Sequence, residues 1–391
     1  MHVVMFYHSL RSDWNHGNAH FLRGVATELL TRGHRVTVYE PADAWSAANL
    51  VADQGPGALE RYRTAYPAFA GPRFRSVVFD PATLDLDAAL GTADLVLVHE
   101  WNAHSLVARI GAHRAATGAA YRLLFHDTHH RSATAPAEMA RYDLSEYDGA
   151  LTFGEVIRER YLLAGWAARA WTWHEAADVR VFRPVPDGDR AERAGDLVWI
   201  GNWGDGERSA ELHEFLIEPA RALGLRAMVH GVRYPPEARR ALADAAIAYG
   251  GWLPNFEVPC RFARYAMTVH VPRRAYARCL PGIPTIRVFE ALACGIPLVS
   301  APWDDAEGLF SPGSDYLIAM SGNQMRRHLR VLRDDSAMAQ EVAARGRAAI
   351  MARHTCGHRV DELLRIVEAL TGPAPAALSH TGGAGRAVGA P

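Results

Sequence analysis

Short apolar runs alternate with amphipathic helical segments along most of the chain, and this alternation restricts the possible folds more than any other feature. The run Val3 to Tyr7 has the length of one buried strand. After a polar loop, one helical face collects the apolar residues Phe21, Leu22, Val25, Ala26, Leu29 and Leu30. Gly33 suits the end of that helix, and Val36 to Tyr39 predicts the next strand. The opening is therefore a βαβ unit, which builds doubly wound parallel sheets.

The same alternation continues through both halves of the chain. Further strands are expected at residues 95–98, 121–125 and 150–153, and then at 197–200, 226–230, 246–249, 267–271, 297–300 and 316–319. At 391 residues the chain exceeds the usual size of one domain, and a polar stretch rich in Pro and Gly separates its halves. We expect an α/β fold of two Rossmann-like doubly wound domains. The expected order is a domain at 1–185, a linker at 186–195, a second domain at 196–354, a helix at 355–370 and a disordered tail at 371–391.

Composition excludes several classes of protein. Lys and Arg number 42 against 43 Asp and Glu, so no global field would attract nucleic acid or an anionic membrane, and no nucleic-acid partner is expected. The four cysteines are far apart and form no CxxC pair, which argues against a disulfide framework and a structural zinc site. The first apolar run is too short for a signal peptide or a spanning helix. We expect a cytoplasmic protein with no integral membrane segment.

The segment Leu280 to Trp303 is the most informative about function. A loop, a helix that begins at Thr285 and a strand follow one another closely in this segment. Gly282 permits close approach of the backbone, and the free amides near Thr285 and Ile286 lie at the positive end of the helix dipole. Arg287 adds a full positive charge. This combination suits a diphosphate.

Arg287 and Glu290 are three residues apart and share one face of this helix, while Ile286, Phe289 and Ala293 occupy another. Spacing alone also allows the pair to be an exposed salt bridge, which is common on helix surfaces.

The run from Arg287 to Gly295, RVFEALACG, resembles the donor-binding helix of GT-B glycosyltransferases. It is most similar to the bacterial group that includes the spore-maturation-protein glycosyltransferases, which is related to the family-4-type retaining enzymes. The resemblance implies two Rossmann-like domains that face each other across a cleft. It also implies that Glu290 accepts hydrogen bonds from the ribose of a nucleotide-diphosphate sugar, an anionic acceptor matched to a diol.

The sequence departs from this family at Gly282, and again at Asn202, which stands where these enzymes carry a basic residue. Gly282 stands eight residues before Glu290, where the family-4-type enzymes carry a second Glu that contacts the donor sugar. Recognition of the sugar, and the retaining or inverting outcome, therefore stay open.

A glycine-rich turn after the strand at 197–200 is also similar to these enzymes. Their turn carries basic residues for the diphosphate, and here Arg208 and Asn202 occupy those positions. Arg233, after the next strand, is a third candidate contact in the donor site.

Polar residues follow three strands of the first domain, where α/β sheets place ligands. The resemblance implies that the first loop, with Gly17 and Asn18, approaches the donor sugar or the acceptor. His99 and Glu100 are further candidates on the acceptor side.

Phe125 is followed by the sequence HDTHH, and the resemblance implies that His126 contacts the transferred sugar. His126 or Asp127 could be the catalytic base if the reaction inverts. The alternative is a metal site built from His126, Asp127, His129 and His130.

The sequence thus predicts a glycosyltransferase that uses a nucleotide-diphosphate sugar, an unidentified acceptor and no metal or other cofactor. Fixed cations would stabilise the leaving diphosphate in place of a metal ion. Two alternatives remain: a nucleotide-sugar epimerase of the same fold, and a non-catalytic protein that binds nucleotide sugars. A metal-dependent hydrolase would require the histidine cluster to hold an ion.

Overall fold

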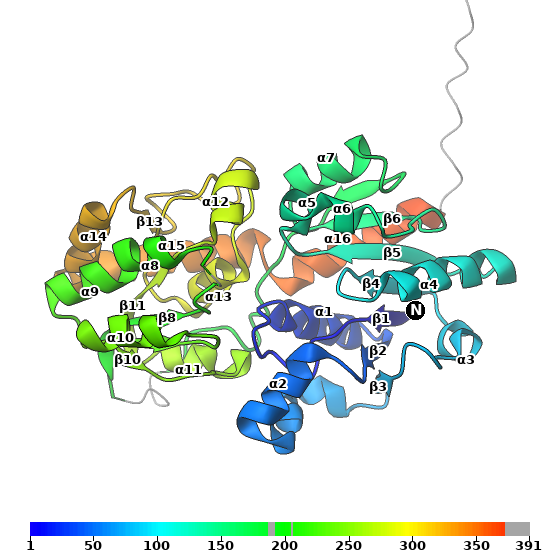
Figure 1. Cartoon of the computed structure of the whole chain (residues 1–391), viewed down its shortest axis with the longest axis horizontal. Helices are drawn as coiled ribbons and strands as arrows, with labels where there is room; N and C mark the ends of the chain where they lie inside the picture. Colours follow the sequence, from blue (N-terminus) through cyan, green and yellow to red (C-terminus); the bar gives the residue numbers. More distant parts are fainter. Residues whose placement is uncertain (187–191, 205, 372–391) are drawn as a thin grey trace, which may run out of the picture.

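The structure, a computed structural model, describes residues 1–186, 192–204 and 206–371. Two α/β domains lie side by side, each built around its own parallel sheet (Figure 1). This arrangement confirms the predicted pair of Rossmann-like domains. Residues 187–191 of the expected linker and residues 372–391 of the expected tail lie outside the described part.

The N-terminal sheet has seven parallel strands in the spatial order β3-β2-β1-β4-β5-β6-β7. The chain builds outward from β1 on one side, then returns to add β4 on the other, so the loops after β1 and β4 diverge. Such a switch point is where parallel sheets bind ligands. The strands are β1 (His2–Phe6), β2 (Arg35–Pro41), β3 (Phe74–Phe79), β4 (Leu95–His99), β5 (Arg122–Asp127), β6 (Gly149–Thr152) and β7 (Ala170–Thr172).

The C-terminal sheet repeats this plan with six parallel strands in the order β10-β9-β8-β11-β12-β13. Its switch point lies between β8 and β11. The strands are β8 (Gly195–Ile200), β9 (Ala227–His230), β10 (Ala248–Tyr249), β11 (Tyr265–His270), β12 (Leu298–Ser300) and β13 (Leu317–Ile318).

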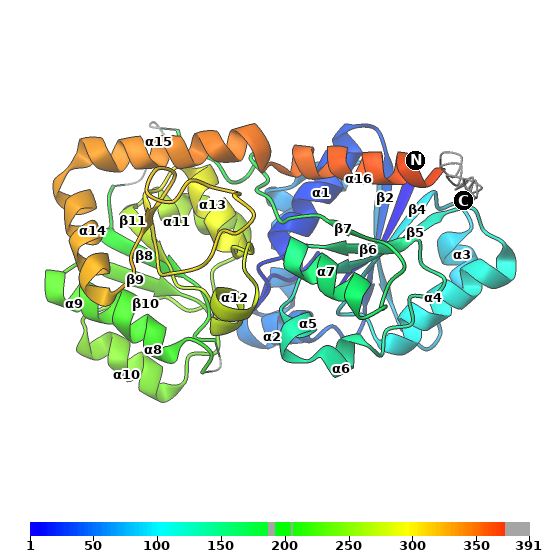
Figure 2. The ribbon, with the colours of Figure 1, turned by 90° about the horizontal axis from the view of Figure 1, so that it is seen from above.

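Helices cover the sheets of both domains (Figures 1 and 2). Those before β8 are α1 (Ala19–Thr31), α2 (Trp45–Gln54), α3 (Leu86–Leu90), α4 (His104–Thr117), α5 (Arg131–Thr134), α6 (Pro136–Met139) and α7 (Glu155–Leu163). Those after β8 are α8 (Ser209–Leu212), α9 (Glu218–Leu223), α10 (Pro236–Asp244), α11 (Val258–Phe262), α12 (Arg274–Cys279), α13 (Ile286–Cys294), α14 (Gly322–Asp334), α15 (Ser336–Arg353) and α16 (Cys356–Thr371). No helix among the described residues is long and apolar enough to cross a membrane.

The last helix returns to the first domain. Figure 2 shows α15 along the C-terminal domain and α16 continuing over the N-terminal one. The indole N–H of Trp173 donates to the carbonyl of Arg359 at 2.8 Å, and Val360 and Leu363 of α16 are fully buried. One hydrophobic core joins α1, α13 and α16. The C-terminal helix α16 therefore packs on the N-terminal domain and links it to the C-terminal domain.

Two strands, β3 and β7, were not expected from the sequence. Both lie at the edges of the N-terminal sheet. The side chains of β3 are mostly half-buried or exposed, and β7 has only three residues, all half-buried. Such strands lack the continuous apolar run that identifies a central parallel strand.

Candidate active site

A cavity of about 850 Å³ lies between the two domains. Its N-terminal wall comes from the loops after β1, β2, β4 and β5, and its C-terminal wall from the loops after β8, β9 and β11 and the start of α13. Both sheets thus contribute the ends of their strands to one site. Of the expected site residues, nine line the cavity: Gly17, Asn18, Glu100, Asn202, Arg208, Arg233, Thr285, Ile286 and Arg287.

The C-terminal wall is rich in guanidinium groups. Arg208, Arg233, Arg273 and Arg287 all line the cavity there. Arg273 pairs with Glu207 at 3.0 Å, and Arg287 pairs with Glu290. Arg208 differs from these two cations in its partners.

Arg208 forms no ion pair with any residue that the structure describes. Its terminal nitrogens donate to the carbonyls of Val271, at 2.9 Å, and Asn202. Its guanidinium lies 5.1 Å from the ring of Trp199, and its Nε has no hydrogen-bond partner among the described residues. Burial, and then the charge of Arg273, lower the pKa of Arg208 to about 10. A desolvated cation held beside a second cation favours binding of an anion at this wall.

The start of α13 faces the cavity as predicted, but one of its amides already has a partner. Thr285 precedes the helix, and its hydroxyl is hydrogen-bonded to His270 at 3.1 Å. The carboxyl group of Glu175, which comes from the N-terminal domain and lines the cavity, interacts with the backbone N–H of Ile286. Glu175 is 4% exposed. Burial, and then the charge of Glu290, raise its pKa to about 8.

Sequence reasoning missed Glu175. It lies just after β7, an edge strand that the apolar pattern did not reveal, and it reaches α13 only because the domains close on each other. A Glu shortly after a strand is the only signal that the sequence offered.

Glu290 is fully buried and does not line the cavity. Its carboxylate pairs with Arg287 and lies 3.0 Å from Nδ1 of His20, on α1 of the other domain. Nε2 of His20 accepts a hydrogen bond from the backbone N–H of Asp178, so Nδ1 carries the proton and donates to Glu290. The Arg287–Glu290 pair is thus not the exposed salt bridge that spacing alone allowed. In this structure Glu290 holds Arg287 and joins the domains.

Gly282 also lies away from the cavity. Its φ is +85°, and a Cβ there would come within 2.6 Å of the Glu307 side chain. Glu307 accepts from the backbone N–H of Glu155 at 2.8 Å and pairs with His174 at 3.0 Å, both in the N-terminal domain. The glycine therefore makes room for a contact between the domains.

Asn18 and Asn202 link the loops that meet at the cavity. The side-chain amide of Asn18 donates to the hydroxyl of Thr128. Asn202 donates to Asn15 of the N-terminal domain and accepts from the backbone N–H of Val232 at 3.0 Å. Asn202 therefore lies at the cavity wall, but its side-chain hydrogen bonds position the neighbouring loops.

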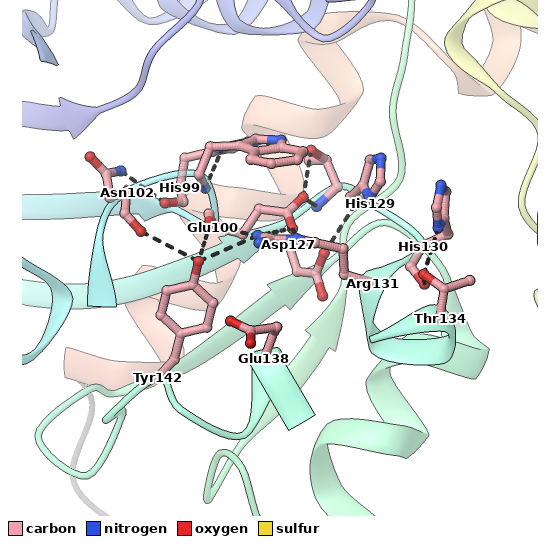
Figure 3. A network of polar contacts seen from close by, with 12 residues as sticks. His99, Glu100, Asn102, Asp127, His129, His130, Arg131, Thr134, Glu138 and Tyr142 are labelled. Atoms are coloured by element: carbon pink, nitrogen blue, oxygen red, sulfur yellow. Dashed lines mark hydrogen bonds and ion pairs between the residues drawn. The ribbon is translucent and has the colours of Figure 1, made fainter. Parts of the chain in front are cut away.

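A buried polar network supports the N-terminal wall. Figure 3 shows the hydroxyl of Tyr142 close to Glu100, Asn102 and Arg131. Arg131 pairs with the carboxylate of Glu100 at 2.8 Å, and both line the cavity. Burial and the neighbouring charge of Glu100 raise the pKa of Asp127 well above its usual value. Burial also raises the pKa of Glu100, but Arg131 opposes that rise, so Asp127 is the member of the pair that holds a proton more readily.

His99, His126 and Asp127 form a buried layer behind this wall and do not line the cavity. His126 Nδ1 is hydrogen-bonded to the hydroxyl of Tyr7 at 2.7 Å, and burial lowers the pKa of His126 to about 3. His99 bonds the hydroxyl of Thr128 at 2.9 Å. The next two histidines of the same run, His129 and His130, do reach the wall.

The metal alternative has no support in this geometry. Among the described residues, no group of three or more His, Cys, Asp or Glu side chains is placed to hold a metal ion. His129 instead packs edge-on against Trp101 at 5.2 Å, and His130 bonds the hydroxyl of Thr134 at 2.9 Å.

Residues 208–365 match the family model described as "Glycosyl transferase-like". No curated protein matches the chain by sequence. Among solved structures, an alpha-glucosyltransferase in complex with UDP and DNA is 12% identical, with a TM-score of 0.65 and coverage of 94% of this chain and 100% of that one. Sucrose-phosphate synthase from Thermosynechococcus elongatus is 12% identical, with a TM-score of 0.63 and coverage of 95% and 99%. HepE from Anabaena in complex with UDP and glucose is 13% identical, with a TM-score of 0.63 and coverage of 94% and 99%.

These comparisons confirm two expectations. The solved structures are matched over nearly their whole length and confirm the GT-B arrangement of the two domains. The matched segment contains β9 to β13, α13 and Arg208, and it confirms the expected class of enzyme, a glycosyltransferase. The resemblance to the spore-maturation group remains a prediction.

Proposed function

We propose that this glycosyltransferase takes a sugar from a nucleotide-diphosphate donor without a metal ion and transfers it to an acceptor on the N-terminal side of the cavity. The observation that carries the proposal is Arg208, a desolvated guanidinium with an unused Nε and no ion pair among the described residues. Arg287 and the start of α13 line the same cavity. The alpha-glucosyltransferase and HepE structures, which contain UDP, support a nucleotide donor.

In the proposed reaction the bond between the anomeric carbon and the diphosphate oxygen breaks, and a bond to an acceptor oxygen forms. The diphosphate leaves with the bonding electron pair, and the acceptor hydroxyl loses its proton. Arg208 and Arg287 would stabilise the negative charge as it develops on the leaving group, since fixed cations need no reorganisation at that moment.

His126 and Asp127, the base candidates from the sequence, are assigned a different role in this proposal. Both are buried behind the wall, and burial raises the pKa of Asp127 well above its usual value, which makes it a poor match for an ionised base at the cavity. We assign them to positioning of the loop that carries His129 and His130. Glu290 likewise is assigned to orienting Arg287, with which it pairs.

Binding of UDP, GDP and ADP, measured by calorimetry in EDTA, tests the donor site. Wild type should bind at least one of these nucleotides, and Arg208→Ala should weaken that binding about tenfold or more, as expected for the loss of charge-assisted hydrogen bonds. Arg221→Ala, on the exposed face of α9, is the matched control and should bind like wild type. The proposal fails if folded wild type binds none of the three, or if Arg208→Ala binds the preferred nucleotide as tightly as wild type.

A further inference from the structure

Two exposed indole rings stand at the N-terminal side of the cavity. Trp45 begins α2, just after β2, and Trp101 follows β4. Their exposed fractions are 46% and 40%, and both line the cavity. Large aromatic surface left open to water beside a cavity commonly marks a binding site.

Neighbouring side chains hold both rings in place. The imidazole of His16 meets both rings edge-on, with centroid distances of 6.4 Å to Trp45 and 6.1 Å to Trp101. The guanidinium of Arg131 lies 4.3 Å from the ring of Trp101, and that of Arg233 lies 5.8 Å from the ring of Trp45. The indoles are therefore preorganised, and a ligand that stacks on them loses little entropy in ordering them.

The orientation of His16 is itself fixed. Its Nε2 is hydrogen-bonded to Nε2 of His8 at 2.8 Å, and burial lowers the pKa of His16 to about 4. His16 therefore stays neutral at physiological pH, and the aromatic group Trp45–His16–Trp101 carries no charge of its own.

On the N-terminal side of the cavity, the charges around this aromatic group do not favour a polyanion. Arg233, which lies against Trp45, belongs to the C-terminal wall that we assign to the donor. Arg131, behind Trp101, is already neutralised by Glu100. Asp43, two residues before Trp45, adds an exposed carboxylate to the same wall. A nucleic-acid surface needs cations free to contact phosphates. Flat apolar rings beside hydrogen-bond acceptors instead match a sugar, which has apolar C–H faces and a rim of hydroxyl groups.

We propose that Trp45 and Trp101 form the acceptor subsite, and that the acceptor is an oligosaccharide without phosphate groups, whose sugar rings stack on these indoles. This inference rests on the proposed function, because it assigns the acceptor of that reaction. The carboxylate of Asp43 accepts hydrogen bonds from the sugar hydroxyls. The terminal hydroxyl of the oligosaccharide then points into the cavity toward the donor.

The test measures acceptor and donor binding separately on the full chain. Maltoheptaose, cellopentaose, chitopentaose and a 13-base-pair DNA duplex are titrated by calorimetry in the presence of saturating UDP. The variants are Trp45→Ala, Trp101→Ala and the milder Trp101→Phe. Leu163→Ala, which changes an 89% exposed side chain outside the cavity, is the control.

At least one oligosaccharide should bind to wild type. Each Trp→Ala change should weaken the binding of that oligosaccharide about tenfold, as for aromatic anchors in other interfaces. Trp101→Phe should lose less oligosaccharide affinity than Trp101→Ala, and the control Leu163→Ala should lose none. UDP binding should stay within about twofold of wild type in every variant. That last readout separates the two proposals, because a wild type that binds none of UDP, GDP and ADP would refute the donor site instead.

Two results would overturn the acceptor assignment. In the first, wild type binds UDP, but no oligosaccharide binds with an affinity that falls when Trp45 or Trp101 is changed. The other is binding of the DNA duplex, sensitive to Trp45 and Trp101, in preference to every oligosaccharide.

Discussion

Gly17 of the N-terminal domain lies directly against Ile286 of the C-terminal domain. A Cβ added to Gly17 would come within 2.6 Å of Cγ2 of Ile286, a separation that real Cβ atoms essentially never show. Both residues also line the cavity. The first loop and the start of α13 are therefore in contact, and the absence of a side chain at position 17 allows the domains to approach this closely.

Gly17→Ala should hinder closure of the domains. The branched side chain of Ile286 is stiff and cannot easily move away from a new methyl group. Since the proposed donor contacts lie on the C-terminal domain, we expect kcat/KM for sugar transfer to fall at least about tenfold while UDP affinity changes little. Steady-state kinetics and calorimetry together measure both quantities.

A second substitution provides the control. Ile286→Ala removes the methyl group that Gly17→Ala would meet, so the double variant should recover part of the lost kcat/KM. If Gly17→Ala transfers sugar at the wild-type rate, the contact does not limit closure.

Gly282→Ala should destabilise the protein more than Gly308→Ala. Both glycines have positive φ, +85° and +62°, so both changes strain the backbone by about 1 kcal/mol or more. At Gly308 a Cβ would meet nothing within 4 Å, whereas at Gly282 it would meet Glu307 at 2.6 Å. Glu307 would have to give up its bonds to the other domain.

We therefore expect Gly282→Ala to lose about 1 kcal/mol more unfolding free energy than Gly308→Ala, measured by urea denaturation. Small-angle scattering should also show a larger radius of gyration for Gly282→Ala alone. Equal losses in the two variants would mean that Glu307 moves aside without cost.

The sequence predicted the two sheets well and the side-chain roles less well, for a physical reason. Central strands such as β1 and β4 are buried on both faces and carry unbroken apolar runs, which identify them without any tertiary information. The start of α13 and Arg287, which the sequence predicts as an anion site, both line the cavity, and the anion site itself stays a prediction. Both signals are local, so one sequence suffices to read them.

Contacts between the domains could not be predicted in this way. Glu290 was expected to face a ligand, but His20 of α1 reaches it from 270 residues away in the chain. Glu175 and Glu307 also find their partners across the domain interface. No periodicity or spacing encodes which residues meet when two separately built domains close.

Asp127→Asn and Glu100→Gln should differ sharply, although both remove a carboxyl from the same buried network. Burial raises the pKa of Asp127 well above its usual value and so favours its protonated form, which an amide of the same shape replaces closely. Glu100 is ionised against Arg131, and its loss would leave a partly buried cation without a counter-ion. Removing one member of a buried pair costs about 3–5 kcal/mol.

A raised pKa means that folding keeps a proton that the unfolded chain releases at neutral pH, which costs stability there. Asp127→Asn should therefore be at least as stable as wild type at pH 7, while Glu100→Gln should be several kcal/mol less stable. Thermal and urea unfolding at pH 7 check this ordering. The reverse order would place the proton on Glu100.

Glu175 makes a pH-dependent prediction at the donor site itself. Its pKa is raised to about 8 from the ordinary 4.5, so the folded protein holds this proton at pH 7 and releases it as the pH rises through 8. A neutral carboxyl beside α13 can donate a hydrogen bond to a phosphate oxygen, whereas a carboxylate would repel it. UDP affinity of wild type should thus fall severalfold between pH 7 and pH 9.

Glu175→Gln removes this titration but keeps an oxygen that can accept from the amide of Ile286. The ionisation of UDP itself affects wild type and Glu175→Gln equally, so it cancels in the ratio of their affinities, and UDP affinity should fall with pH more steeply in wild type than in Glu175→Gln. Stability gives an independent readout. Because the pKa is raised on folding, the unfolding free energy of wild type should fall relative to that of Glu175→Gln as the pH rises from about 5 to 8. Above pH 8 the difference should stay constant. The total loss should be about 1.4 kcal/mol per unit of pKa shift. Parallel pH profiles for the two proteins would show that Glu175 does not titrate in this range.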